Sequence, residues 1–252
     1  MPTPAEKRAA FQRLHEQGCF MIPNPWNVGS ALHLQSLGFK AIASTSYGFA
    51  LWLGRPDYGL QRDELLDHLR EVAAASDLPL NADYEGGFAV EPEGVAANVR
   101  LAVDTGLAGL SIEDRVIGGE SQGLLPLDLA VERIEAARAA IDQDESGVVL
   151  VGRCEGYLVG EANVATVIGR LQAYAEAGAD CLFPAGINNI DDVAALARAL
   201  APKPINVIQR ADLAFAALRD VGVRRVSVGG GLSRAAWIGF DEAAKALAAE
   251  GR

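Results

Sequence analysis

Short apolar runs rich in β-branched residues alternate with helical patterns eight times along the chain, and this alternation constrains the fold more than any other feature. The runs expected to form strands are CFMIPN, KAIASTS, LPLNADYE, LAGLSIED, GVVLVGRCE, ADCLFPAG, KPINVIQR and RRVSVGGG. The segments between them, such as residues 92–106 and 163–178, place apolar side chains at the i, i+3, i+4 spacing of amphipathic helices. Repeated units of this kind are typical of parallel strands joined by crossover helices.

Eight such units in 252 residues predict an α/β fold, a (β/α)8 TIM barrel formed as a single domain over residues 1–252 with an N-terminal helix. A doubly wound open sheet is the alternative, but it usually has fewer strands and needs a GxGxxG phosphate-binding turn after its first strand. No such turn follows CFMIPN. No linker rich in Pro or Ser interrupts the repeats, so we expect one domain.

Composition excludes several classes of partner. The chain has 22 basic and 33 acidic residues and a formal net charge of −11, whereas nucleic-acid binding requires a basic face, so no nucleic-acid partner is expected. No run of about 18 apolar residues occurs, so no membrane association is expected. The three cysteines are odd in number and lack CxxC spacing, which indicates neither a disulfide framework nor a zinc site and favours a cytoplasmic protein.

Polar residues gather where the expected strands end, which is where barrels of this kind carry their active sites. These strand-end residues are Asn24, Ser44, Thr45, Ser46, Asp83, Glu85, Glu113, Asp114, Arg153, Glu155, Asn206 and the run Gly229–Gly231. Because residues two apart on a strand face the same way, we expect Asp83 and Glu85 to project together beside Glu113 of the next strand. Three converging carboxylates with no histidine among them favour a hard divalent ion, Mg²⁺ or Mn²⁺. Taken singly, each acid is equally well explained as a helix cap or an ion-pair partner.

Other residue types narrow the chemistry further. All three histidines fall in expected helices and no lysine follows a strand, which argues against a His-ligated metallohydrolase and a Schiff-base aldolase. Arg153 is the one basic strand-end group and suits a substrate that carries a carboxylate, although an ion pair with Glu113 or Glu155 is the alternative. The run Gly229–Gly231 indicates either a phosphate cradle or a tight turn between strand and helix.

These residues resemble the isocitrate lyase and phosphoenolpyruvate mutase superfamily. The resemblance covers about residues 20–236 and lies in the segments NPWNVGSALHLQSLGFKAIASTSYGFALWLGRPD, NADYEGGF, LSIEDR, VGRCEGYL, AYAEAGADCLFPAGI, PINVI and GVRRVSVGGGLSRAA. It implies a barrel that holds Mg²⁺, which chelates a small α-keto acid or its enolate while a bond next to the carbonyl is made or broken.

The resemblance also implies roles for individual residues. Asp83 is similar to the direct metal ligand, and Glu85 and Glu113 to partners of the metal-bound waters. Arg153 resembles the guanidinium group that holds the substrate and stabilises the enolate, and Arg153, Glu113 and Asn206 are the expected catalytic residues. The expected substrate-binding residues are Arg153, Asp57 of the GRPD segment, and Thr45, Ser46 and Tyr47, whose backbone amides resemble a carboxylate-binding turn.

Departures from the family pattern limit the expected reaction. Isocitrate and methylisocitrate lyases carry a KxCGH loop after the IED segment, but IEDRVIGGESQGLLPLD contains no Cys, Lys or His, so neither lyase activity is expected. Candidates for a loop function are Glu120, Ser121 and Gln122. The family often exchanges a C-terminal helix between subunits, while this sequence stops soon after its last expected helix; we expect a homo-oligomer, a dimer or a tetramer.

Four functions are compatible with these features. The first is an Mg²⁺-dependent lyase or hydrolase that cleaves a carbon–carbon bond next to the carbonyl of a small α-keto dicarboxylate such as oxaloacetate. The second is a phosphoenolpyruvate mutase or phosphonopyruvate hydrolase type of enzyme that acts on a phosphorus–carbon bond. The third is a phosphate-binding barrel that uses the glycine run, and the fourth is a non-catalytic protein that binds an α-keto acid.

Overall fold

All eight expected strands are present in the expected order. The computed structural model describes residues 1–116, 123–143, 145–160 and 163–251, and each strand falls within the run predicted for it. The strands are β1 (Phe20–Ile22), β2 (Ile42–Ala43), β3 (Leu80–Asp83), β4 (Gly109–Glu113), β5 (Val149–Cys154), β6 (Cys181–Pro184), β7 (Asn206–Ile208) and β8 (Arg225–Ser227).

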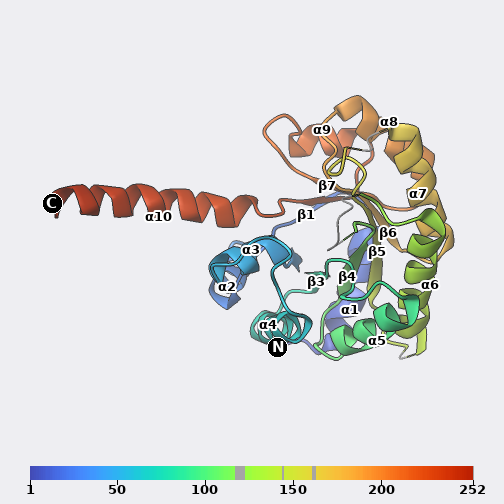
Figure 1. Cartoon of the computed structure of the whole chain (residues 1–252), viewed down its shortest axis with the longest axis horizontal. Coiled ribbons are helices and arrows are strands. Elements are labelled where there is room, and N and C mark those ends of the chain that lie inside the picture. Colours follow the sequence, from blue (N-terminus) through green and yellow to red (C-terminus); the bar gives the residue numbers. More distant parts are fainter. Residues whose placement is uncertain (117–122, 144, 161–162, 252) are drawn as a thin grey trace.

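Helices surround the strands, as Figure 1 shows. They are α1 (Pro4–Glu16), α2 (Val28–Ser36), α3 (Ser46–Trp52), α4 (Arg62–Ala75), α5 (Pro92–Val103), α6 (Leu127–Gln143), α7 (Val164–Glu176), α8 (Ile190–Leu200), α9 (Phe215–Asp220) and α10 (Gly231–Glu250). Local sequence sets several of their starts, since Asn27, Asn163 and Asn189 each cap the first turn of a helix by accepting a backbone N–H.

The strands pair in parallel but divide into two sheets. One sheet has the order β2-β3-β4-β5-β6 and the other the order β1-β8-β7. Backbone hydrogen bonds span the two seams, from Ala43 N to Pro23 O and from Leu182 N to Pro204 O, both at 3.0 Å, and Leu182 and Ile205 form an isolated parallel bridge. The predicted barrel is therefore observed in part, as a curled five-stranded sheet that faces a three-stranded one and not as one continuous ladder.

Apolar side chains form two layers, one on each face of the strands. The larger layer fills the space between strands and helices, and includes the buried side chains of Leu80, Leu110 and Leu150. The smaller layer lies on the inner face of the strands and consists largely of small residues such as Ala43, Ala108 and Val151. Because few bulky side chains face inward, the interior is left partly open toward the carboxyl ends of the strands.

Helix α1 closes the other end of the strands. Its Phe11 is fully buried in the inner layer, and a Cβ on Gly109 of β4 would lie only 2.7 Å from the Phe11 ring. The side chains of Lys7, Arg8 and Gln12 donate to carbonyls of segments that precede β3, β4 and β5. Helix α1 thus covers the inner layer at the N-terminal ends of the strands.

The last helix, α10, does not cover the strands. Figure 1 shows it leaving the body along the longest axis of the molecule, and Ser233 in its first turn is its only buried residue. Over the described residues, no helix combines the length and the apolar character needed to cross a membrane.

His68 on α4 makes stability depend on pH. Its ring is 6% exposed and stacks on Phe49 with 3.8 Å between ring centroids, and burial lowers its pKa to about 4. Below the ordinary histidine pKa of about 6.5, the unfolded chain therefore binds a proton that the folded chain does not. We predict that this group contributes stability above pH 6.5 and that the contribution is lost as the pH falls toward 4, by about 3 kcal/mol at most.

Urea unfolding of the wild type and of His68→Phe between pH 7.5 and 4 isolates this contribution, because phenylalanine does not titrate. The wild type should lose free energy of unfolding relative to the variant as the pH falls. A difference between the two proteins that stays constant over this range would contradict the prediction.

Candidate active site

A cavity of about 130 Å³ opens at the carboxyl ends of the strands. The predicted residues that line it are Thr45, Ser46, Tyr47, Asp57, Asp83, Glu113, Arg153 and Asn206. They come from β3, β4, β5 and β7 and from the segments after β2. Glu85 is the one predicted site residue outside this set. The structure thus brings together side chains that lie up to 161 positions apart in the sequence.

Asp83, at the end of β3, is held from two sides. Its Oδ2 accepts hydrogen bonds from the backbone N and the Oγ of Ser46, both at 2.9 Å, and its Oδ1 accepts one from Arg153 Nη1 at 3.0 Å. Its own backbone N donates to Ser44 Oγ at 2.9 Å. These contacts fix the carboxylate at the cavity wall. Oδ2 accepts two hydrogen bonds and Oδ1 accepts one, so Oδ1 retains a lone pair for another ligand.

Arg153, on β5, is surrounded by carboxylates. Its Nε donates to Glu155 Oε1 at 2.6 Å, and its Nη1 lies 3.0 Å from Asp83 Oδ1 and 3.4 Å from Glu113 Oε2. Burial alone would lower the pKa of Arg153, but the three carboxylates raise it, so the group stays charged. The predicted ion pairs with Glu113 and Glu155 are therefore present. Nη2 makes no hydrogen bond to any described residue and is the part of the guanidinium group available to a ligand.

Asp114 supports this arrangement from behind. Its Oδ1 accepts the backbone N–H of Glu155 at 2.8 Å, and its Oδ2 accepts the Tyr174 hydroxyl at 2.6 Å. Asp114 therefore joins the end of β4 to the residue that holds Arg153. Its role in the structure is to position the cluster, since its own carboxylate is occupied and does not line the cavity.

Glu113 is a buried carboxyl group with spare hydrogen-bonding capacity. It is 2% exposed, and its Oε1 has no hydrogen-bond partner among the described residues. Burial raises its pKa, with Glu155 and Asp83 adding to the rise, while Arg153 and a hydrogen bond with Tyr58 oppose it. A carboxyl group in this state binds readily to a cation or to a hydrogen-bond donor.

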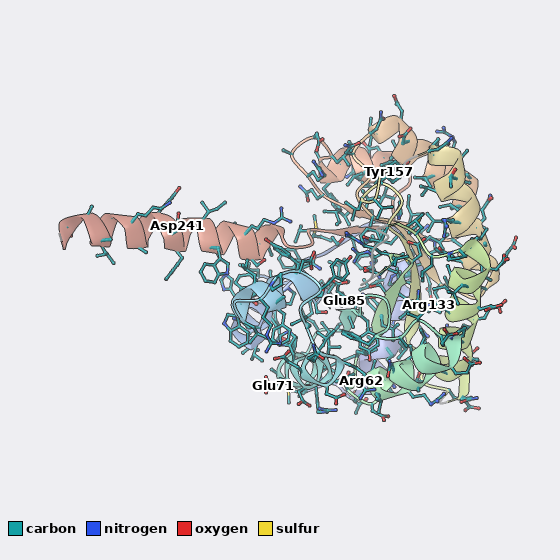
Figure 2. All side chains as sticks on the ribbon, viewed as in Figure 1. Arg62, Glu71, Glu85, Arg133, Tyr157 and Asp241 are labelled. Atoms are coloured by element: carbon teal, nitrogen blue, oxygen red, sulfur yellow. The ribbon has the colours of Figure 1, made fainter. Side chains whose placement is uncertain are left out.

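Glu85 follows the end of β3, and its predicted role beside Asp83 stays a prediction. Strand β3 ends at Asp83, and Glu85 has a positive φ of 48°, so the strand alternation on which the prediction depended has already stopped. Its side chain lines a second cavity of about 400 Å³ together with that of Arg133, and both residues, labelled in Figure 2, are buried. Burial and the nearby charges of Asp83 and Asp57 raise the pKa of Glu85 to about 8.

Asp57 and Tyr58 lie at the mouth. Partial burial and the charge of Asp83 raise the pKa of Asp57. Tyr58 has a positive φ of 59°, which is unusual for a tyrosine, and it lines both cavities. Its ring lies 5.1 Å beneath the Arg115 guanidinium group. Tyr58 therefore forms part of the wall between the two cavities.

Part of the predicted carboxylate-binding turn already makes hydrogen bonds within the protein. Thr45 caps α3 by accepting the backbone N–H of Gly48, and the amide of Ser46 donates to Asp83. Tyr47 lies against Gly230, where a Cβ would approach the ring to 2.5 Å. The glycine run thus allows close packing of Tyr47. The amides of Val228 and Gly229 both donate to Asn24 Oδ1, which leaves them unavailable for a phosphate.

Asn206 was placed at the wrong end of its strand. It is the first residue of β7 and not the last, so its side chain lies at the floor of the cavity. Its Oδ1 accepts from Arg225 Nε at 2.9 Å and its Nδ2 donates to Ser227 Oγ at 3.0 Å. Sequence reasoning missed Arg225 and Asn81, which also line the floor. For Asn81 the available signal was its place two positions before Asp83 on the same strand.

The described residues fit a hard divalent cation held largely through water. Buried carboxylate oxygens of Glu85 and Glu113 lack hydrogen-bond partners, and burial, with a smaller contribution from nearby carboxylates, raises the pKa values of both groups. Within the described ranges, no three or more His, Cys, Asp or Glu side chains are arranged to hold an ion directly. The roles predicted for Asp83, Glu85 and Glu113 stay predictions. The loop candidates Glu120, Ser121 and Gln122 lie outside the described residues.

The chain is similar in sequence and fold to several known proteins. A family model described as phosphoenolpyruvate phosphomutase matches residues 11–248. A crystal structure from Burkholderia cenocepacia J2315, provisionally described as a lyase/mutase, has a TM-score of 0.95 and 42% identity and covers 99% of this chain and 91% of that chain. Oxaloacetate acetylhydrolase in complex with oxalate has a TM-score of 0.90 and 25% identity, with 100% and 90% covered. The 2-methylisocitrate lyase of Escherichia coli K12 is 35% identical over 183 residues, which are 70% of this chain and 61% of that protein.

Removal of the Arg153 charge should destabilise the fold strongly. Arg153→Gln leaves Glu113 and Glu155, which are 2% and 0% exposed in their side chains, without a counter-charge. Breaking a buried ion pair in this way costs about 3–5 kcal/mol. We predict a loss of that size in the free energy of urea unfolding at pH 7.

Arg138→Gln is the matched control, because Arg138 also pairs with two acids, Asp142 and Asp180, whose side chains are 65% and 44% exposed. Exposed pairs contribute about 1 kcal/mol or less. Equal losses in the two variants would show that Arg153 does not carry the charge balance of a buried cluster.

Proposed function

Since the chain belongs to the phosphoenolpyruvate phosphomutase family, we propose that it is a lyase or hydrolase dependent on a divalent cation, Mg²⁺ or Mn²⁺. The proposed reaction cleaves a carbon–carbon bond next to the carbonyl of a small α-keto dicarboxylate such as oxaloacetate. The observation that carries this proposal is the cluster in which Asp83, Glu113 and Glu155 surround Arg153 at the wall of a small cavity.

The chemistry requires stabilisation of an enolate. Decarboxylation of oxaloacetate releases carbon dioxide and leaves the electron pair of the broken bond on the enolate of pyruvate, which then takes a proton. Hydrolytic cleavage instead adds water across the bond and gives oxalate and acetate. A bound divalent cation would polarise the keto oxygen as a Lewis acid, with Asp83 holding the ion and Glu113 and Glu85 holding its waters.

The chain's own residues supply orientation and a hydrogen bond. Ser46 and Arg153 hold the Asp83 carboxylate in one position, and Asp114 holds Glu155 and through it Arg153. The unoccupied Nη2 of Arg153 is available to donate to the oxygen on which negative charge develops. The small volume of the cavity limits access of water and suits a ligand of a few carbon atoms.

Action on a phosphorus–carbon bond is the second candidate, favoured by the description of the matching family model. The engaged amides of Val228 and Gly229 give the glycine run no visible role in binding a phosphoryl group. Non-catalytic binding of an α-keto acid is the third. The three candidates differ in product, so one set of assays separates them.

We also propose that the protein is a homo-oligomer assembled through α10. Trp237, Phe240 and Leu247 recur on one face of this helix and are 41%, 64% and 69% exposed. A groove of about 190 Å³ lies between this face and Trp26 and Trp52 of the body. A helix exposed on almost all sides is marginally stable by itself, and a chain that presents both an apolar groove and an apolar helix is self-complementary. The proposed occupant is α10 of a second copy.

The first prediction of this proposal concerns binding. In the presence of Mg²⁺, oxaloacetate or 2-oxobutyrate should raise the melting temperature of the wild type by mass action, and this increase should vanish in Asp83→Ala. Asp67→Ala on the exposed face of α4 is the matched control and should behave as the wild type.

Product analysis completes the test. Pyruvate, or oxalate with acetate, formed from oxaloacetate supports the proposed reaction, whereas inorganic phosphate from phosphonopyruvate supports the second candidate. Stabilisation without any turnover supports the non-catalytic one. If no keto acid stabilises the wild type with or without Mg²⁺, the proposed function is wrong.

The second prediction concerns assembly. Light scattering after gel filtration should give at least twice the monomer mass of 26.5 kDa for the wild type and the monomer mass for the double variant Trp237→Lys, Phe240→Lys. Lys245→Glu, which changes a residue paired with Asp241 on the polar face of α10, should leave the mass unchanged. A monomeric wild type would rule out this assembly.

A further inference from the structure

Arg225, the first residue of β8, is a buried guanidinium group whose hydrogen-bond partners are all neutral. It is 2% exposed, and its Nε and Nη1 donate to Asn206 Oδ1 at 2.9 Å and Asn81 Oδ1 at 3.2 Å. His15 Nε2 lies 3.5 Å from Nη1, and the Phe11 ring lies 6.0 Å away. Across the described part of the chain, Arg225 forms no ion pair and its Nη2 makes no hydrogen bond. An unpaired buried charge is costly, which makes its presence informative.

The candidate active-site cavity extends down to this group. The same cavity is lined by Arg153 and Asp83 at the mouth and by Arg225 and Asn206 at the floor. Between mouth and floor its wall includes Ala43, Ser111 and Ser227, which are small. Barrels of this type usually fill their interior with bulky branched residues, so small side chains at these positions keep the passage open.

The two arginines of the cavity differ in their charge balance. Arg153 already has three carboxylate partners, so it offers a hydrogen bond but no net positive charge. Arg225 has none, and burial lowers its pKa with only the Cys181 thiol opposing the shift. Of the described groups that line the cavity, Arg225 is therefore the cation best placed to attract an anion.

We propose that Arg225 binds the distal carboxylate of a small dicarboxylate whose keto or hydroxy end lies beside Asp83 and Arg153. This inference rests on the proposed function and assigns the residue that recognises the second carboxylate of its dicarboxylate substrate.

The spacing along β3 is compatible with this mode of binding. Arg225 contacts Asn81 and Arg153 contacts Asp83, and two residues along a strand span roughly 7 Å. Asn81 and Asn206 provide the floor with amide groups that hold the guanidinium in place without neutralising it. An arginine with a purely structural role would gain more from a carboxylate at one of these two positions.

Malate and 2-hydroxybutyrate provide a stable pair of ligands that differ only in the distal carboxylate. Isothermal titration in the presence of Mg²⁺ should show that the wild type binds malate about 10- to 100-fold more tightly, the range expected for a charge-assisted contact. In Arg225→Gln the affinity for malate should fall to that for 2-hydroxybutyrate, and the affinity for 2-hydroxybutyrate should change little. Arg225→Lys should retain part of the preference.

Asn81→Asp provides a test that does not depend on removal of a buried arginine. The new carboxylate is nearly isosteric with the amide and would pair with Arg225 at a contact that already exists. The preference for malate should disappear in this variant although Arg225 is still present. Circular dichroism and the melting transition verify that each variant is folded.

The outcomes separate this inference from the proposed function. If wild type binds both acids equally, or if the preference for malate persists in Arg225→Gln and Asn81→Asp, the role of Arg225 is overturned while the proposed function stands. If neither these acids nor 2-oxobutyrate bind the wild type with Mg²⁺, both proposals are wrong.

Discussion

The burial of the Arg153 charge is the constraint on which the rest of the site depends. Counter-charges stabilise the buried guanidinium group of Arg153, and they come from the ends of β3 and β4 and from the residue that follows β5. The three carboxylates in turn repel one another without Arg153. Neighbouring strands must therefore keep one register, in which Glu113 pairs with Arg153 across β4 and β5. Chemistry and sheet geometry are fixed by the same contacts.

The larger apolar layer, between the strands and the helices, provides the stability that offsets this concentration of buried charge. Almost all of the apolar burial lies between the strands and the surrounding helices, and it does not involve the cavity. The inner face can therefore carry alanine, serine and asparagine beside a few branched residues such as Val151. Helix α1 covers the inner layer at the far end with Phe11, and the polar interior opens toward the carboxyl ends of the strands. The division between a stabilising outer layer and an open inner layer follows directly from the period-two pattern of the strands.

Sequence patterns predicted the order of all eight strands, and with it the grouping of Asp83, Glu113 and Arg153, because the ends of regular strands can be read from apolar periodicity. The same reasoning does not locate the Glu85 side chain, since it extended strand alternation past the point where the backbone adopts a positive φ. It failed for Asn206 because a strand of three residues gives too weak a pattern to locate its ends. Arg225 was missed since a cation at the start of a strand suggests solvent, and only the tertiary structure places Asn81 and Asn206 around it.

The charges of the cavity also link the two ligands proposed for it. Three carboxylates, Asp57, Asp83 and Glu113, line it against two guanidinium groups, which leaves one net negative charge when all are ionised. That balance opposes a dicarboxylate by itself. A divalent cation reverses the sign of the net charge, and a dianion then restores the original value. Each ligand is therefore bound more favourably when the other is present, and by linkage the coupling is equal in both directions. Arg225 lies at the floor of the cavity, and Asp83 would hold the divalent cation at the mouth. The two charges of the dianion would therefore meet positive partners at opposite ends of the cavity.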